Sequence, residues 1–459
     1  MRGLDQIMQN AYLSGNYAPV QTELTTFDLQ VIGELPPELC GRYLRNGPNP
    51  AAPVDPATHH WFLGDGMVHG VRLRDGKAEW YRNRYVGSSH LSELRGQPDI
   101  AGPNWNDSSV GPNTSVGGFA GTTWAMLEAG GVPVELSYEL ETVGRNDFYG
   151  TLPGAFTAHP KVDLVTGELH AMVYAWQEWL DHIQYVVVGR DGRVRHTVDI
   201  PLPGMSMVHD MSLTQRYAVI YDQPVTVDMD VALAGLFPFR WDPDYGNRVG
   251  LMPREGAAGD ILWIDVPLGY AYHPMNAYDA PDGSVIIDIC VYDRMFDRDV
   301  LGPFGADGHA RLERWTLNPQ ARSCAVTVID ARPNEFPKHR GSVAGRPYTY
   351  GYCASPSVDP AEGWPTLKHN LVSGERQVFD HGRGRAGGEP IFVARTDSAA
   401  EDDGWLIILV HDLGAGTTEL VVLDAADFAR GTVARVVLPQ RVPFGFHGNW
   451  VSDEQVSQL

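Results

Sequence analysis

Short strand patterns joined by Asp-Gly turns recur along this chain, and they constrain its fold more than any other feature. Residues 71–81 contain two such patterns around Asp75-Gly76, and an Asp-Gly pair between strands predicts a tight β-hairpin. The same arrangement returns at residues 185–200 and 278–292. Further strands are predicted at residues 168–174, 406–413 and 419–423. Because no long helical pattern interrupts them, we expect an all-β protein.

The hairpins continue through all 459 residues without a recognisable linker. Radial repetition of small sheets protects their edges without a second domain, so this density of hairpins predicts a β-propeller. A set of β-sandwiches is the alternative, although such domains are normally separated by linkers. We therefore expect one β-propeller domain over residues 1–459.

Charge and cysteine usage narrow the functional class. The formal net charge of −22 argues against a nucleic-acid binder. The four cysteines lack the spacing of a zinc site, which favours reduced thiols in a cytoplasmic protein. They are Cys40, Cys290, Cys324 and Cys353. Residues 1–6 lack the apolar core of a secretory signal, and no apolar run approaches the ~20 residues that span a bilayer. We expect a cytoplasmic monomer.

Four of the sixteen histidines share one setting, in which Pro, Gly or Asp stands beside the histidine where a strand pattern starts or stops. They are His159, His209, His273 and His447. Their separations of 50, 64 and 174 residues (209 − 159, 273 − 209 and 447 − 273) do not match any local zinc motif. Histidines so far apart meet only if the chain returns repeatedly to one axis. Neutral imidazoles in an apolar wall are good ligands of transition metals, whereas an isolated histidine is more often a hydrogen-bonded core residue.

Ordered motifs around these histidines give the sequence a specific resemblance to a known family. They are Gly41-Arg42-Tyr43-Leu44-Arg45-Asn46-Gly47-Pro48-Asn49-Pro50, Gly64-Asp65-Gly66-Met67-Val68-His69-Gly70, Asn113-Thr114, the four histidine segments, Asn334-Glu335-Phe336-Pro337, Glu389-Pro390-Ile391-Phe392-Val393 and Glu401-Asp402-Asp403-Gly404. From near Phe27 to Trp450 the chain resembles the carotenoid cleavage oxygenase family. The resemblance implies a seven-bladed propeller that holds nonhaem Fe(II) on the four histidines, with a cap of loops and short helices over the metal-bearing face.

The resemblance also implies residues around the metal. A ligating imidazole needs its second ring nitrogen held, usually by a carboxylate, and the family uses three glutamates for this purpose. The matching residues in this chain are Glu128, Glu335 and Glu389, and the sequence does not assign a glutamate to a histidine. Thr114 matches a residue whose methyl group leans toward an open metal position in some relatives, although a threonine packed in a strand is the simpler alternative.

The resemblance implies oxidative cleavage of one C=C bond by O₂ to give two carbonyl products, but it does not settle the substrate. The stilbene-cleaving branch places Lys before the first of the three glutamates, where it binds a phenol oxygen. This chain has Leu127 there, which favours a hydrophobic polyene, either a carotenoid or an apocarotenoid. Cleavage of a stilbene or phenylpropene is the alternative. A propeller that serves only as a binding scaffold is disfavoured by the complete set of histidines and glutamates.

Two hydrophobic features suggest how such a substrate reaches the metal. Residues 231–241 carry Leu233, Leu236, Phe237 and Phe239, which we expect to form an apolar lip that touches a membrane surface weakly. The alternative is that this segment packs as the core of the cap. Several aromatic residues are candidates for a tunnel wall or for ordinary core: Phe119, Trp124, Trp176, Trp179 and Phe336.

Overall fold

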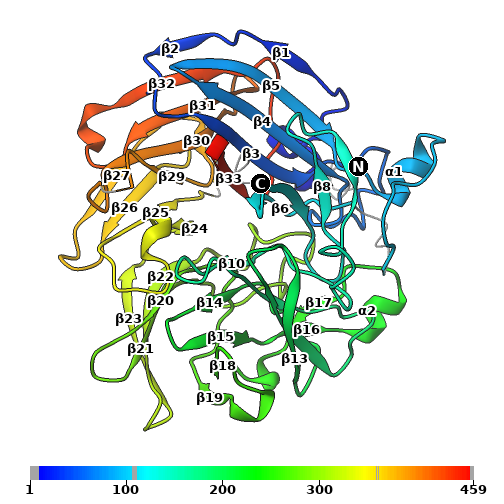
Figure 1. Cartoon of the computed structure of the whole chain (residues 1–459), viewed down its shortest axis with the longest axis vertical. Coiled ribbons are helices and arrows are strands. Elements are labelled where there is room, and N and C mark those ends of the chain that lie inside the picture. Colours follow the sequence, from blue (N-terminus) through cyan, green and yellow to red (C-terminus); the bar gives the residue numbers. More distant parts are fainter. Residues whose placement is uncertain (1–9, 106–110, 358, 360, 398, 455–459) are drawn as a thin grey trace, which may run out of the picture.

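Seven sheets of four or more strands surround a central axis in the computed structural model, which describes residues 10–105, 111–357, 359, 361–397 and 399–454. Figure 1 looks down on this ring, with the sheets arranged as blades around its centre. This arrangement confirms the expected seven-bladed β-propeller. Residues 1–6, where no signal sequence was expected, lie outside the described residues.

Each sheet runs outward from an inner strand near the axis. In this order, the first contains β33 (Gly448–Ser452), β3 (Gly41–Pro48), β4 (Gly66–Arg74), β5 (Lys77–Tyr85) and β1 (Thr25–Phe27). The second contains β6 (Ser115–Phe119), β7 (Thr122–Met126), β8 (Val134–Leu136) and β9 (Thr142–Arg145). The third contains β10 (Lys161–Val162), β11 (Leu169–Val173), β12 (His182–Val188) and β13 (Val194–Pro201). The fourth contains β14 (Met211–Leu213), β15 (Tyr217–Asp222), β18 (Arg248–Pro253) and β19 (Leu262–Asp265).

The fifth sheet contains β20 (Pro274–Asp279), β21 (Val285–Val291), β22 (Arg311–Asn318) and β23 (Ser323–Asp330). The sixth contains β24 (Glu335–Lys338), β25 (Tyr350–Ala354), β26 (Thr366–Asn370) and β27 (Arg376–Phe379). In the seventh, β28 (Arg385–Gly387) and β29 (Ile391–Ala394) both pair with β30 (Gly404–Asp412), followed by β31 (Thr417–Asp424), β32 (Thr432–Val437) and β2 (Val31–Gly33).

The Asp-Gly turns join antiparallel strands where the sequence predicts hairpins. Asp75 and Gly76 have φ values of +48° and +73° between β4 and β5, a left-handed pair that matches the twist of a two-residue hairpin. The turns at Asp191-Gly192 and Asp282-Gly283 likewise lie between β12 and β13 and between β20 and β21. These three predicted hairpins are confirmed.

Two pairings close the ring between the ends of the chain. Strand β33 pairs with β3, so that Arg45 lies opposite Gly448, and β2 pairs with β32. Apolar side chains fill the space between neighbouring sheets. For example, Val219 of β15 and Ile289 of β21 belong to one fully buried cluster. This packing fixes each inner strand relative to the next and makes the centre of the ring a rigid frame.

Helices are few and short in the described part of the chain. The α-helices are α1 (Ser89–Leu94) and α2 (Met229–Leu233), and the 3-10 turns are η1 (Ala11–Leu13), η2 (Gly15–Tyr17), η3 (Pro243–Tyr245), η4 (Ala258–Asp260), η5 (Gly341–Val343) and η6 (Phe428–Arg430). A two-stranded sheet of β16 (Val225–Val227) and β17 (Phe239–Trp241) flanks α2. None of the described helices has the length and apolar character needed to cross a membrane.

The segment expected to form an apolar lip divides into exposed and buried halves. Leu233 is 81% exposed and Leu236 is 38% exposed. Phe237 and Phe239, which were expected beside them, are only 8% and 1% exposed. The expectation that these two phenylalanines are exposed is wrong. Phe239 lies in β17, which pairs with β16, and Phe237 precedes this strand. Both rings belong to the apolar core that includes Tyr174 and Tyr272.

Candidate metal centre

In each of the seven sheets, one residue predicted from the sequence lies at, or directly beside, the strand nearest the axis. Several neighbouring inner strands contact one another around the axis, among them β33 with β6, β14 with β20 and β29 with β33, so these residues approach one centre although the chain separates them widely. In sheet order they are His447 before β33, Thr114 before β6, His159 before β10, His209 before β14, His273 before β20, Glu335 at the start of β24 and Glu389 between β28 and β29. The propeller thus explains the long separations of the predicted ligands.

The four predicted histidines form one buried cluster. Each offers a ring nitrogen, and these four atoms all lie within 4.8 Å of one another. The Nε2 atom of His273 lies 3.2 Å from the Nε2 atoms of both His209 and His447. The Nε2 atom of His159 is buried and has no hydrogen-bond partner among the described residues. The cluster therefore has converging nitrogen atoms that the protein itself leaves unsatisfied.

The three predicted glutamates each hold a different histidine through its other ring nitrogen. Glu128 Oε1 lies 2.6 Å from Nδ1 of His209. Glu335 Oε2 lies 2.6 Å from Nδ1 of His273, and Glu389 Oε1 lies 2.9 Å from Nδ1 of His447. The structure therefore supplies the assignment of glutamates to histidines that the sequence left open.

These contacts determine which ring nitrogen is free to bind a cation. A carboxylate accepts hydrogen bonds, so the proton of each paired imidazole is on Nδ1 and the lone pair is on Nε2. Burial lowers the pKa of His447 to about 3, although Glu389 acts in the opposite direction. Burial, together with the neighbouring histidines, also lowers the pKa of His159 well below its usual value. Neutral imidazoles whose lone pairs face one another fit a transition-metal ion between them.

His159 differs from the other three because no carboxylate of the described residues hydrogen-bonds to it. Its nearest acidic group is Asp210, whose Oδ2 atom lies 3.7 Å from Nδ1. Asp210 instead binds the ammonium of Lys161 at 2.8 Å. The position of His159 therefore depends on the backbone between Thr157 and β10 rather than on a charged partner.

The three glutamates are themselves held by four donors of three chemical kinds. The hydroxyl group of Tyr174 donates to Oε1 of Glu128. The backbone N–H of Phe336 donates to Oε2 of Glu335 at 2.6 Å. Glu389 accepts the backbone N–H of Gly448 at 2.7 Å and pairs with the ammonium of Lys338 at 2.8 Å. A phenol, a peptide and an ammonium therefore stabilise three carboxylates around one cluster.

Among the groups that lower the pKa of the Glu389 carboxyl, Lys338 has the largest effect. Burial alone raises the pKa of the Glu389 carboxyl, but Lys338 and then His447 hold it well below its usual range. Lys338 and Tyr174 were not identified from the sequence. Lys338 directly follows the Asn334–Pro337 motif and Tyr174 ends a predicted strand, but neither position shows which carboxylate it meets in the fold.

A cavity of about 340 Å³ reaches the cluster from one side, and most of its lining is apolar. His209, His273 and His447 contribute to its inner end. Apolar lining residues from several elements include Phe62, Leu127, Trp176, Leu236, Phe237 and Phe446. Its shape and lining suit a hydrophobic molecule with only a few polar contacts.

Thr114 and Leu127, predicted as neighbours of the metal and of the substrate, both line this cavity. The hydroxyl group of Thr114 donates to Oδ1 of Asn113 at 2.9 Å, and its carbonyl accepts the backbone N–H of His447 at 3.1 Å. The hydroxyl group of Thr114 is therefore paired within the protein. Leu127 immediately precedes Glu128 and adds an apolar surface there.

The aromatic residues proposed for a tunnel separate into three groups. Trp176 and Phe336 line the cavity, whereas Trp179 packs against Trp105 with ring centroids 5.8 Å apart. Phe119 and Trp124 border a second cavity of about 380 Å³, which also contacts His159, Lys161 and Lys338. The sequence does not separate these groups because all five residues are large aromatic residues that suit a tunnel wall and an ordinary core equally well.

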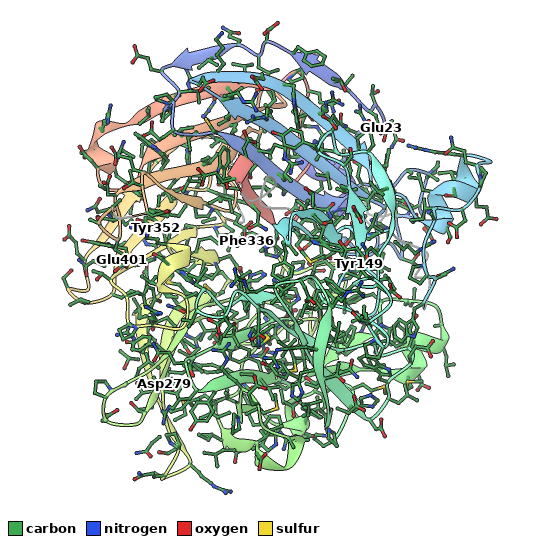
Figure 2. The ribbon with its side chains drawn as sticks, viewed as in Figure 1. Glu23, Tyr149, Asp279, Phe336, Tyr352 and Glu401 are labelled. Atoms are coloured by element: carbon green, nitrogen blue, oxygen red, sulfur yellow. The ribbon has the colours of Figure 1, made fainter. Side chains whose placement is uncertain are left out.

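Phe336 covers two of the histidines. Its ring centroid lies 5.5 Å from that of His273 and 5.6 Å from that of His447. Figure 2 shows Phe336 near the centre of the ring, while Asp279 and Glu401 lie toward its outside. The backbone φ of Phe336 is +53°, which is uncommon for a residue other than glycine. The irregular pairing between β24 and β25 accommodates this conformation.

Comparisons with known proteins find relatives that match nearly the whole chain. A family model described as "RPE65: Retinal pigment epithelial membrane protein" matches residues 17–452. A carotenoid cleavage oxygenase of Mycobacterium tuberculosis is 42% identical, over 96% of this chain and 97% of the relative. The crystal structure of lignostilbene dioxygenase from Pseudomonas brassicacearum is similar with a TM-score of 0.86 and 31% identity, covering 97% of this chain and 99% of its own.

A cobalt-substituted apocarotenoid oxygenase from Synechocystis is also similar in structure, with a TM-score of 0.82 and 26% identity. The match covers 95% of this chain and 97% of that protein. These relatives share nearly the full length of the propeller.

Proposed function

We propose that this chain, which belongs to the RPE65 family of carotenoid cleavage oxygenases, is an Fe(II)-dependent dioxygenase acting on a carotenoid or apocarotenoid. It cleaves one C=C bond with O₂ and forms two carbonyl products. The observation that carries this proposal is the cluster of four buried histidines at the inner end of an apolar cavity.

Fe(II) is the metal that we propose for the cluster. The residues that would hold it are His159, His209, His273 and His447, and four neutral imidazoles suit ferrous iron. When bound, the iron supplies the activation of O₂ toward an electron-rich double bond. Glu128, Glu335 and Glu389 orient three of the rings and increase the basicity of their nitrogen atoms.

The protein's own contribution is to position the double bond and to exclude water. Phe336 and Trp176 provide aromatic surface on which a conjugated chain can pack. The Thr114 methyl group restricts the space beside the cluster. A rigid cavity that holds one double bond next to the cluster lowers the barrier because less positional freedom is lost during the reaction.

Leu127 supports a polyene as the substrate. A phenol that must be deprotonated needs a cationic or basic partner, and Leu127 offers neither at the wall next to Glu128. Cleavage of a stilbene or phenylpropene on the same metal site is the second candidate. The structural similarity to lignostilbene dioxygenase favours it, and the lack of a lysine at this position weighs against it.

We further propose weak membrane contact near the mouth of the cavity. Leu63 and Leu236 both line the cavity and remain substantially exposed, and Leu233 lies close by on α2. Exposed apolar groups around a cavity mouth suit the uptake of a hydrophobic substrate. The net charge of −22 opposes attraction to anionic lipids, so the contact is hydrophobic.

The proposed function is tested by incubating the iron-loaded protein with a panel of carotenoids, apocarotenals and stilbenes in the presence of O₂. Product masses identify both the substrate class and the bond that is cleaved. Preferred turnover of a polyene supports the proposal, whereas turnover of stilbenes alone establishes the second candidate.

A further inference from the structure

Tyr272 places a hydrogen-bond donor without a partner in the wall of the substrate cavity. The residue lines the cavity and is 4% exposed. Its hydroxyl oxygen is buried and has no hydrogen-bond partner among the described residues. Buried hydroxyl groups are normally paired, so this donor calls for a specific explanation.

Nearby tyrosines show that the fold satisfies such hydroxyl groups elsewhere. The Tyr174 hydroxyl group donates to Glu128. Two residues before Tyr272, the Tyr270 hydroxyl group donates to the carbonyl oxygen of Met207 at 3.3 Å. Tyr272 therefore differs from Tyr174 and Tyr270. Tyr352 also has a buried hydroxyl group without a partner among the described residues, but unlike Tyr272 it does not line the cavity.

The ring of Tyr272 is held firmly and close to the histidine cluster. It meets the His209 ring edge-on, with centroids 4.9 Å apart, and it directly precedes His273. It also contacts Tyr270 and Tyr292 edge-on, at 4.8 and 5.8 Å. These ring contacts fix the position of the hydroxyl group in the cavity wall.

We propose that the Tyr272 hydroxyl group is a specificity determinant that donates a hydrogen bond to an oxygen atom of the substrate. The ligand class is a polyene with a carbonyl or hydroxyl oxygen on the part that lies at the inner end of the cavity. A hydrocarbon polyene leaves the donor unpaired, and the enzyme therefore discriminates against it. This inference rests on the proposed cleavage of carotenoids or apocarotenoids.

The test compares Tyr272→Phe with the wild type on three polyenes of equal chain length: an apocarotenal, the corresponding alcohol and the hydrocarbon. Loss of one neutral hydrogen bond should lower kcat/KM about 3- to 10-fold for the aldehyde and the alcohol. The value for the hydrocarbon should stay unchanged. Tyr270→Phe is the matched control, because it removes a buried hydroxyl group that does not line the cavity.

The ratio of oxygenated to hydrocarbon turnover separates this inference from the proposed function. If the wild type cleaves the polyenes and Tyr272→Phe shows the same ratio, the role of Tyr272 is overturned, whereas the proposed function stands. If the wild type cleaves no polyene, both the role of Tyr272 and the proposed function are contradicted. A fall in the ratio for Tyr272→Phe but not for Tyr270→Phe supports the inference.

A second measurement does not depend on turnover. Without ligand, Tyr272→Phe should unfold at the same temperature as the wild type or higher, because it removes an unpaired buried hydroxyl group. With the apocarotenal bound under anaerobic conditions, the wild type should show the larger increase in Tm. Equal increases in both proteins, or a marked loss of stability in the unliganded variant, contradict a donor reserved for substrate.

Discussion

The Nε2 atoms of His209 and His273 lie 3.2 Å apart, while Nδ1 of each ring faces its own glutamate at 2.6 Å. With the protons on Nδ1, both Nε2 atoms carry lone pairs. Two such nitrogen atoms this close together are normally bridged by a proton or share a metal ion. The glutamates thus do more than hold the rings in place, since they also decide that the cluster presents acceptors and no donors.

The first prediction is that Fe(II) stabilises the protein through this cluster. At free Fe(II) about 100 times its Kd, binding should add ~2.7 kcal/mol to the free energy of unfolding. Replacing His447 by Ala should abolish most of this gain, whereas replacing the exposed His309 should leave it unchanged. Anaerobic thermal unfolding with and without Fe(II) measures the effect. An equal gain in the His447→Ala protein would exclude the cluster as the binding site.

A second prediction concerns the glutamates. Glu128→Gln, Glu335→Gln and Glu389→Gln should each weaken metal affinity or activity about 10- to 100-fold, because a neutral amide supports the imidazole less well than a carboxylate. The exposed Glu375 provides a matched control. Titration with Fe(II) and steady-state kinetics give the two readouts. Wild-type affinity and activity in all three variants would show that the glutamates are dispensable.

The third prediction distinguishes the two substrate classes. Because Leu127 gives the cavity wall no cation, an apocarotenal should be cleaved with a higher kcat/KM than a hydroxylated stilbene. Leu127→Lys should shift this ratio toward the stilbene, while Leu127→Met should leave it nearly unchanged. Competition between the two substrates in one reaction measures the ratio directly. A stilbene preference in the wild type would overturn the interpretation of Leu127.

The fourth prediction tests the apolar surface at the cavity mouth. A Leu233→Ser/Leu236→Ser protein should bind neutral liposomes less than the wild type and should cleave liposome-embedded substrate more slowly, with unchanged turnover in detergent. Val372 is 78% exposed on the hairpin between β26 and β27, so Val372→Ser is the control. Flotation of the proteins with liposomes measures binding. If the wild type, the double variant and the control bind liposomes equally and cleave the embedded substrate at the same rate, the surface is only a lid over the cavity.

The propeller and its four histidines could be anticipated from local signals. Asp-Gly pairs such as Asp75-Gly76 mark hairpins because few other residues accept the backbone angles of the turn. His159 and His209 stand beside Pro160 and Asp210 at the edges of strand patterns. The order of the surrounding motifs then linked all four histidines to one family. The spacing of the histidines alone did not identify that family.

Contacts between distant sheets could not be anticipated in the same way. The pairing of Glu389 with His447 depends on how the last two inner strands meet, and the donor Lys338 comes from another sheet again. Phe237 and Leu236 are adjacent and both hydrophobic, but one ring is buried against His60 and the other side chain is exposed. Hydrophobicity alone does not say which side of a cap a residue faces.

The role of the four histidines in iron-dependent cleavage of a polyene is tested by product analysis with a matched variant. The iron-loaded wild type is incubated with an apocarotenal under O₂, beside a His447→Ala protein treated identically. We predict two carbonyl products from the wild type, with masses that together equal the substrate plus one molecule of O₂, and none from the variant. Uncleaved substrate with the iron-loaded wild type, or the same two products from the His447→Ala protein, would contradict this role of the cluster.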